Sequence, residues 1–296
     1  MRLITHTDLD GVICAVLICS VEQIDEVKFI DPGTIQARKL AIKKEDILAD
    51  LPYDSRVGIW FDHHESSKPK QGQKFEGAWS MAPSAARVIF DYYENPYLDK
   101  FGNIVKETDR IDSGGVTLAD VENPQGLFLI SNTFETTSPK SFDDRYRRHV
   151  IGLLREQPDI EKVLADASVK ERCANFTKEA EIFKAILLES TKVIGNVAFS
   201  DLRQRPDLPR GNNYIVYSLF PQCTTSVRLM PLKEEKDSVK LSVGHNVFGK
   251  KSDFDVGTAM KKIGGGGHRA VGGATISKED AEKIAMQIVE EINSSA

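Results

Sequence analysis

The sequence has no hydrophobic run long enough to cross a lipid bilayer. Its longest apolar stretch, Val12–Cys19, falls far short of the roughly 20 residues that a transmembrane helix needs. Acidic residues precede this stretch, whereas a secretory signal peptide carries a basic leader. We therefore expect a cytoplasmic protein that does not bind a membrane.

Cysteine is scarce, and its spacing follows no metal-binding pattern. The four cysteines, Cys14, Cys19, Cys173 and Cys223, form no C-x-x-C pair. Such pairs are typical of zinc knuckles, and regular cysteine frameworks are typical of disulfide-rich secreted domains. The sequence therefore favours reduced, structural thiols.

Neither sign of charge dominates the composition. The 39 Lys and Arg residues against 44 Asp and Glu residues give a formal net charge of −5. This balance argues against a broad nucleic-acid-binding surface, because such surfaces carry a basic stripe, but it leaves room for a small phosphate pocket. The length of 296 residues suffices for about two domains.

Strand-like and helix-like segments alternate in the first half of the chain. Short β-rich runs occur at Arg2–Thr5, Val27–Ile30, Ile47–Ala49 and Val57–Phe61. Val12–Val21 and Ala85–Tyr93 have the pattern of helices. This alternation predicts a parallel sheet with helices on its faces. Residues 141–190 contain almost no glycine and predict further helices, the last of which, over 171–190, bridges to a second domain.

The composition changes after residue 190. Arg203–Asn213 is rich in proline, asparagine and arginine, which is typical of a loop. Strands are predicted over Tyr214–Leu219, Thr225–Met230 and Ser238–Val243. An apolar stripe after Asp280 predicts a C-terminal amphipathic helix.

Acidic residues and histidines gather at the ends of the predicted strands. They are His6, Asp8 and Asp10 after the first strand, Asp50 after Ile47–Ala49, Asp62-His63-His64 at the end of Val57–Phe61, and Asp109 with Asp112 further along. The carboxyl ends of parallel strands form the edge at which α/β proteins bind ligands. So many carboxylates repel one another unless cations lie between them. Carboxylate and imidazole without thiolate suit Mn²⁺ or Mg²⁺ better than a structural zinc ion.

Each of these residues also has a purely structural interpretation. Asp8 or Asp10 could cap the helix that follows, and Asp109 or Asp112 could pair with Arg110. The combination of all of them at successive strand ends is what favours metal binding.

Two separate groups of motifs resemble the DHH family of phosphoesterases. Thr5-His6-Thr7-Asp8-Leu9-Asp10-Gly11 and Phe61-Asp62-His63-His64 resemble the first and third motifs of that family. Gly264-Gly265-Gly266-Gly267-His268, followed by Gly272-Gly273, resembles the signature of its associated C-terminal domain. Members include the exonuclease RecJ, oligoribonucleases that act on nanoRNA, cyclic-dinucleotide phosphodiesterases and exopolyphosphatase-like proteins.

The resemblance implies a centre of two divalent cations, expected to be Mn²⁺, with Mg²⁺ or Co²⁺ as alternatives. The implied ligands are His6, Asp8, Asp10, Asp50, His63 and Asp109. Asp50 would bridge both cations, and Asp46, four residues earlier, is the alternative. Asp112 and Ser113 lie close to Asp109, so the fourth motif is placed only within this segment.

The resemblance also implies residues that act on or hold the substrate. His64 would lie near the phosphate, and Asp62 would orient the histidines or touch a metal. Four consecutive glycines are usually a flexible linker, but here they lie between predicted ordered elements. Glycine lets a backbone approach an anion closely, so the family match favours an anchor for a terminal phosphate or nucleotide. Its residues would be Gly265, Gly266, Gly267, His268 and Arg228.

We therefore predict an α/β protein with two domains and an active site in the cleft between them. The N-terminal domain, 1–190, has a parallel sheet flanked by helices, and the smaller C-terminal α/β domain is 191–296. The expected reaction is metal-dependent hydrolysis of phosphoester bonds in a short oligonucleotide, a dinucleotide or a nucleoside bisphosphate. Polyphosphate is the alternative substrate, and a non-catalytic RNA-binding module is the third interpretation. A homodimer is one option for the assembly. The segment Arg145–His149 is expected to be a solvated helix face.

Overall fold

The computed structural model describes residues 1–134, 140–232, 235, 237–250 and 252–295, and the chain divides into two compact units. Unit 1 comprises Met1–Val116 and Pro124–Ala174, and unit 2 comprises Thr117–Asn123 and Asn175–Ala296. The chain thus passes between the units three times, at 116/117, 123/124 and 174/175. The helix expected to bridge two domains is α9 (Ala167–Ser190), and the last of these crossings lies inside it.

Unit 1 is built on a five-stranded parallel sheet, as the sequence predicts, with the strand order β2-β1-β3-β4-β5. The strands are β1 (Arg2–Thr5), β2 (Glu26–Phe29), β3 (Asp46–Ala49), β4 (Ile59–Asp62) and β5 (Glu76–Trp79). The register pairs Thr5 with Ala49 and Ala49 with Phe61. Because these three strands end level with one another, the residues that follow them meet at one edge of the sheet.

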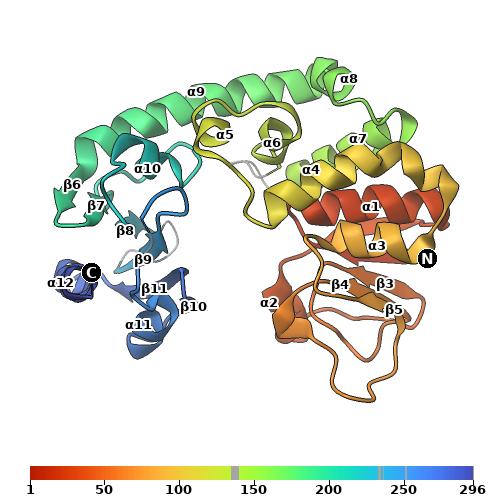
Figure 1. Ribbon diagram of the computed structural model, residues 1–296, viewed down its shortest axis with the longest axis horizontal. Coiled ribbons are helices and arrows are strands. Elements are labelled where there is room, and N and C mark those ends of the chain that lie inside the picture. Colours follow the sequence, from red (N-terminus) through yellow and green to blue (C-terminus); the bar gives the residue numbers. More distant parts are fainter. Residues whose placement is uncertain (135–139, 233–234, 236, 251, 296) are drawn as a thin grey trace. The chain divides into compact units, whose positions relative to one another are not determined.

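Helix α1 (Leu9–Val21) forms the centre of the unit 1 core. Its residues from Leu9 to Cys19 are all buried, because α3, α4 and α7 pack around it and the sheet lies against it. Figure 1 shows α1 and α3 side by side over the strands. The remaining helices of unit 1 are α2 (Pro32–Gln36), α3 (Ala85–Tyr93), α4 (Gly102–Asp112), α6 (Gly126–Ser131), α7 (Lys140–Glu156) and α8 (Ile160–Ala165), with 3-10 turns η1 (Glu65–Ser67) and η2 (Pro96–Phe101). A second apolar cluster, which includes Leu48 and Trp60, is built around the strands and contains Ile35 of α2.

The expectation of a solvated face at Arg145–His149 is wrong for two of its residues. Tyr146 and Arg147 are buried, whereas Arg145, Arg148 and His149 are exposed. Because α7 packs against α1, its inward positions recur every three or four residues, and Tyr146 and Arg147 fall on that stripe.

Unit 2 contains a six-stranded sheet with the order β10-β11-β9-β8-β7-β6, antiparallel except for the parallel pair β7 and β8. Its strands are β6 (Thr191–Ile194), β7 (Val197–Asp201), β8 (Thr225–Pro231), β9 (Ser238–His245), β10 (Gly266–His268) and β11 (Val271–Ser277). Its helices are α5 (Leu118–Glu122), α10 (Ile215–Leu219), α11 (Val256–Lys262) and α12 (Ala281–Ser294). Side chains of α11 and α12 pack with Val227, Leu229 and Leu241 in the core of this unit.

The strand predicted over Tyr214–Leu219 is wrong, because Ile215–Leu219 is the short helix α10. A brief apolar run does not distinguish a strand from a buried helical turn by pattern alone. Here Asn212 accepts a hydrogen bond from the backbone nitrogen of Tyr214, and α5 packs against the helix that follows. Among the described residues, no helix combines the length and hydrophobicity that a membrane span would need.

Candidate metal centre

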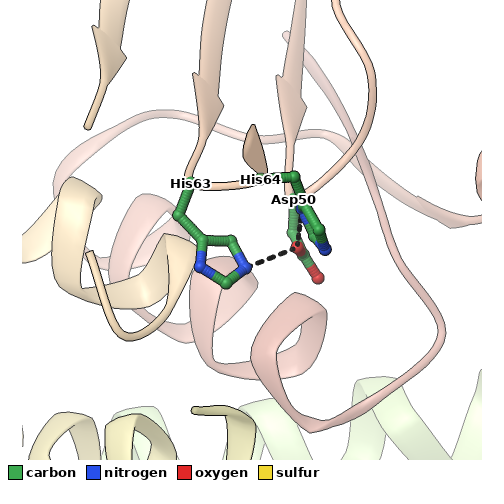
Figure 2. A group of neighbouring side chains, drawn as sticks. All are labelled: Asp50, His63 and His64. Carbon is green, nitrogen blue, oxygen red and sulfur yellow. Dashed lines mark ion pairs between the residues drawn. The ribbon is translucent and has the colours of Figure 1, made fainter. Parts of the chain in front are cut away.

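Asp50, His63 and His64 meet where β3 and β4 end (Figure 2). The backbone nitrogen of Asp50 donates to the carbonyl of Phe61 over 2.9 Å, which ties the two strand ends together. His63 Nε2 lies 3.9 Å and His64 Nδ1 lies 3.7 Å from Asp50 Oδ1. Both carboxylate oxygens of Asp50 are buried, and neither has a hydrogen-bond partner. A buried carboxylate left in this state is unfavourable unless a cation neutralises it.

The backbone of Asp50 is itself unusual. Its φ angle is +56°, in the left-handed region that non-glycine residues seldom adopt. Strained backbone of this kind persists where surrounding structure enforces it, and it concentrates at functional sites. The turn directs a carboxylate to the sheet edge immediately after an apolar strand.

A second group joins Asp50 to the turn after β1. His6 Nδ1 lies 2.8 Å from Asp8 Oδ2 and 3.5 Å from Asp50 Oδ2. Asp8 also accepts a hydrogen bond from the backbone nitrogen of Gly11 over 3.0 Å and so caps α1. The capping role and a ligand role therefore use different oxygens of one carboxylate.

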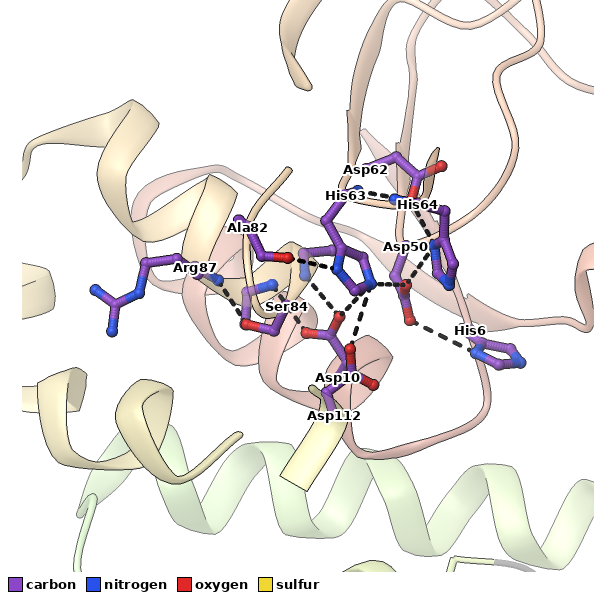
Figure 3. A network of polar contacts seen from close by, with 12 residues as sticks. His6, Asp10, Asp50, Asp62, His63, His64, Ala82, Ser84, Arg87 and Asp112 are labelled. Carbon is purple, nitrogen blue, oxygen red and sulfur yellow. Dashed lines mark hydrogen bonds and ion pairs between the residues drawn. The ribbon is translucent and has the colours of Figure 1, made fainter. Parts of the chain in front are cut away.

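A third group contains Asp10, His63 and Asp112 (Figure 3). His63 Nε2 lies 3.3 Å from Asp112 Oδ2 and 3.8 Å from Asp10 Oδ2. The Asp10 oxygens accept hydrogen bonds of 2.6 and 2.8 Å from the backbone nitrogens of Ala85 and Ala86, the first residues of α3. This helix start holds the Asp10 carboxylate in place and favours its negative charge.

The tautomer of His63 is fixed by the backbone. Its Nδ1 lies 3.0 Å from the carbonyl oxygen of Ala82, which can only accept a hydrogen bond. Nδ1 therefore carries a proton, which leaves Nε2, on the side of the carboxylates, as the nitrogen that can bind a cation. Metal-binding histidines are typically oriented in this way.

The three groups overlap, and their donor atoms fit divalent cations. Within each group the candidate ligand atoms lie within 4.8 Å of one another. Asp50 belongs to two groups and His63 to two, so the groups form a continuous chain rather than separate sites. Carboxylate oxygens together with imidazole nitrogens are ligands for divalent metal cations.

The electrostatics of the cluster agree with this fit. Burial, reinforced by the neighbouring carboxylates, raises the pKa of Asp10 and of Asp50 well above the usual value. Burial and the charge of Asp8 also raise the pKa of Asp112. Burial lowers the pKa of His6, but the hydrogen bond with Asp8 and the negative charges of the neighbouring aspartates together outweigh burial and raise it. A bound cation would favour the charged form of these carboxylates and so oppose the rise in their pKa.

Asp62 organises the two histidines that follow it. Its Oδ1 accepts hydrogen bonds from the backbone nitrogens of His63 and His64, over 2.8 and 3.2 Å, and lies 2.8 Å from His64 Nδ1. The contact with Asp62 raises the pKa of His64, whose side chain is 50% exposed. The second oxygen, Oδ2, is buried without a partner.

The structure does not bring Asp109 into the cluster. Its Oδ1 accepts a hydrogen bond from Ser84 Oγ over 2.7 Å, and its Oδ2 accepts two from Arg87, over 3.0 and 2.8 Å. Asp112, three residues further along α4, is the residue of this segment that reaches His63. Asp46 is likewise remote from the cluster, because it begins β3 and pairs with Arg2 over 2.5 Å.

Sequence reasoning missed the supporting groups around α3. Ser84 caps α3 by accepting a hydrogen bond from the backbone nitrogen of Arg87, and the helix start then holds Asp10. A serine between Pro83 and two alanines is a recognisable helix-start signal, but its bond to Asp109 depends on tertiary structure. Nothing in the sequence marks the carbonyl of Ala82.

In unit 2, the glycine run forms an edge strand. Gly266 pairs with Gly273 and Gly267 with Gly272 in the hairpin of β10 and β11. A Cβ atom at Gly265 would lie 2.3 Å from the carbonyl oxygen of Gly273, so the hairpin requires glycine there. Gly266, Gly267 and His268 are exposed.

Arg228 lies in a separate pocket of about 210 Å³ within unit 2. It is 5% exposed, its Nε is buried without a hydrogen-bond partner, and its other nitrogens donate to Asn213. Among the described residues, no carboxylate forms an ion pair with it. Burial lowers the pKa of Arg228, as expected for a cation that lacks a counter-charge. The glycine run does not line this pocket.

Comparison with solved structures finds the same fold. The chain resembles a pGpG-specific phosphodiesterase, PggH from Vibrio cholerae, with a TM-score of 0.85 and 29% identity over 100% of this chain and 99% of that one. It also resembles an exonuclease RecJ bound to manganese, with a TM-score of 0.52 and 14% identity over 97% of this chain and 88% of that one. RecJ of Thermus thermophilus in complex with Mn²⁺ matches with a TM-score of 0.53 and 13% identity over 98% of this chain and 52% of that one. No family model and no curated protein matches the sequence.

Proposed function

Because this chain belongs to the DHH family of phosphoester hydrolases, we propose that it hydrolyses short linear dinucleotides in a metal-dependent reaction, with pGpG as the first candidate substrate. The likeness to a pGpG-specific phosphodiesterase over the whole chain supports this substrate class. Metal dependence rests on one observation, the buried and unpartnered carboxylate of Asp50 between two groups of candidate ligands.

The proposed ligands differ from the sequence-based set at one position. His6, Asp8, Asp10, Asp50, His63 and Asp112 would hold two cations, with Mn²⁺ as the first candidate. When bound, such cations would supply Lewis-acid chemistry, polarising the phosphodiester and making water more acidic. Asp50 shares its two oxygens between groups and is the proposed bridge.

Other residues would act on the substrate directly. Asp62 occupies Nδ1 of His64 and leaves Nε2 of this half-exposed ring for a phosphate oxygen or for the leaving oxygen. Water adds across the P–O3′ bond, so each pGpG gives two molecules of GMP. Asp62 thus positions His64, and His64 would hold or donate the proton.

The Arg228 pocket supports a site for the part of the dinucleotide that does not react. Its buried guanidinium has no counter-charge among the described residues, so an anionic phosphate suits it. Tyr214, Val247 and Val271 line the same pocket and are exposed, and the Tyr214 ring lies 5.9 Å from that of Phe248. Such a rim suits the flat face of a base. The family resemblance is the only support for further phosphate contacts by Gly265, Gly266, Gly267 and His268, which we retain as part of the proposal.

The test is a substrate panel on metal-depleted chain that is reloaded with Mn²⁺, Mg²⁺ or Co²⁺. The substrates are pGpG, pApA, cyclic di-GMP, a nucleoside 3′,5′-bisphosphate and polyphosphate. We expect pGpG to be converted to GMP with the highest kcat/KM, best with Mn²⁺, and no turnover with chelator. The Asp50→Asn chain, prepared in parallel, tests whether turnover depends on the proposed metal centre, and a mock purification without the chain controls for contaminating nucleases.

Three results would contradict the proposal. Turnover that continues in the presence of a chelator, or in the Asp50→Asn chain, would contradict the proposed metal dependence. Polyphosphate as the best substrate would establish the exopolyphosphatase alternative. RNA binding without turnover of any substrate would favour the non-catalytic interpretation.

A further inference from the structure

The buried Arg147 contacts the turn that carries the first proposed ligands. It lies on α7, and its Nε donates a 2.7 Å hydrogen bond to the carbonyl oxygen of Thr7, 140 residues earlier. Thr7 stands between His6 and Asp8, whose side chains lie 2.8 Å apart and form part of the proposed metal centre. Arg147 itself is 2% exposed.

The guanidinium of Arg147 is held from two further sides. Its Nη1 donates to Asp144 Oδ1 over 3.0 Å, within the same helix. Its planar group lies over the ring of Phe29, the last residue of β2, with 5.5 Å between the guanidinium carbon and the ring centroid. Because these contacts fix the Arg147 guanidinium, its hydrogen bond to Thr7 restrains the turn after β1.

We propose that Arg147 is a positioning residue for the metal centre and acts through the backbone of Thr7. The Thr7 carbonyl lies in the planar peptide that joins Thr7 to Asp8, so a hydrogen bond to it restrains the backbone of the turn that carries His6 and Asp8. The inference rests on the proposed function, since it assumes that these two side chains are ligands. Ligand sets need placement within about 0.5 Å, and outer groups that orient ligands typically contribute about 10–100-fold in metal affinity.

The neighbouring Arg148 provides a matched control. It lies on the same helix, and its guanidinium packs over the same Phe29 ring at 5.9 Å. However, its Nε and Nη2 donate to the carbonyl of Val27 in β2, over 3.1 and 3.0 Å, and not to the ligand-bearing turn. Arg148 is exposed, and its loss removes hydrogen bonds and an aromatic contact from the same helix without touching His6 or Asp8.

The test compares Arg147→Met, Arg147→Lys and Arg148→Met in the full chain. Mn²⁺ affinity is measured by the electron paramagnetic resonance signal of free Mn²⁺, and folding is checked by circular dichroism and thermal unfolding. We expect Arg147→Met to bind Mn²⁺ about 10–100-fold more weakly, with kcat reduced and KM for pGpG little changed. Arg148→Met should keep the wild-type Mn²⁺ affinity, whatever its change in Tm.

Arg147→Lys keeps a positive charge beside Asp144 but loses the planar fork that fits both partners. It is expected to fold and to show weakened Mn²⁺ binding, so it decides the matter if Arg147→Met does not fold. Wild-type Mn²⁺ affinity in folded Arg147→Lys or Arg147→Met, or an equal loss in Arg148→Met, would overturn the positioning role alone. A wild-type chain that binds no Mn²⁺ would overturn the proposed function and this inference with it.

Discussion

Arg87 donates two hydrogen bonds to Asp109, through Nε and Nη2, and thereby occupies one oxygen of a carboxylate that the family resemblance implies as a metal ligand. Ser84 binds the other oxygen and caps α3, whose first backbone nitrogens hold Asp10. Asp109 therefore supports a proposed ligand from a distance, whereas Asp112 lies 3.3 Å from His63.

The first prediction separates these two residues of α4. Asp112→Ala should reduce the number of bound Mn²⁺ ions and abolish most turnover, because a proposed ligand is lost. Asp109→Ala should retain the Mn²⁺ stoichiometry but lower the free energy of unfolding by about 1.5–3 kcal/mol, the range for hydrogen bonds to charged groups. Mn²⁺ titration and denaturant unfolding of both variants measure this. Loss of bound Mn²⁺ in Asp109→Ala, with normal Mn²⁺ binding in Asp112→Ala, would show that Asp109 is the ligand and Asp112 is not.

A second prediction compares the acids at the two ends of β3. Asp50→Asn should abolish metal binding, yet it should raise the Tm of the metal-free chain, because it removes a buried acid that has no hydrogen-bond partner and whose charge the neighbouring carboxylates oppose. Asn also tolerates the left-handed backbone at this position. Asp46→Asn should instead keep Mn²⁺ binding and lose about 1.5–3 kcal/mol of stability, since it breaks the ion pair with Arg2. A metal-free Asp50→Asn chain less stable than wild type would contradict the account of Asp50.

The third prediction concerns the Arg228 pocket. An anchor for the non-reacting phosphate contributes equally to the ground and transition states, so its loss raises KM and leaves kcat nearly unchanged. Arg228→Met should raise KM for pGpG by roughly 10–150-fold, which corresponds to about 1.5–3 kcal/mol. Arg269→Met removes an exposed arginine that does not line this pocket and serves as the control. His268→Ala should also act through KM, and a collapse of kcat in that variant would place His268 among the catalytic residues.

The fourth prediction uses the thiols. All four cysteines are buried, and burial raises the pKa of each, that of Cys173 to about 11. A raised pKa means that the reactive thiolate is nearly absent at pH 8 and increases only as the pH approaches the new value. We expect no reaction with a colorimetric thiol reagent at pH 8 in the native chain, and four thiols after unfolding. A rapidly reacting thiol in the folded chain would show that one of these sites opens.

The sequence predicted the sheet edge well, for a local reason. Each strand of unit 1 is a short apolar run, and the parallel register that places Asp50 beside Asp62 follows from aligning those runs. The sequence alone could not show that Asp112 lies beside His63 while Asp109 pairs with Arg87, since both acids lie on one helix and their partners come from distant segments. Tyr214–Leu219 was misassigned because α5, a distant segment, packs on it. Arg147 gave no sequence signal, because its partner is a backbone carbonyl.

The three crossings between the units have a consequence for how such a chain can be divided. Residues 117–123, which include α5, belong to unit 2 although they precede Pro124–Ala174 of unit 1. A protease cut at 174/175, or a gene truncated there, would therefore leave α5 on the wrong fragment and uncover the side of α10 against which it packs. Recombination that exchanges only the C-terminal segment would likewise combine α5 of one parent with α10 of the other. The two units are interleaved along the gene, so they are expected to be inherited as a pair rather than as exchangeable modules.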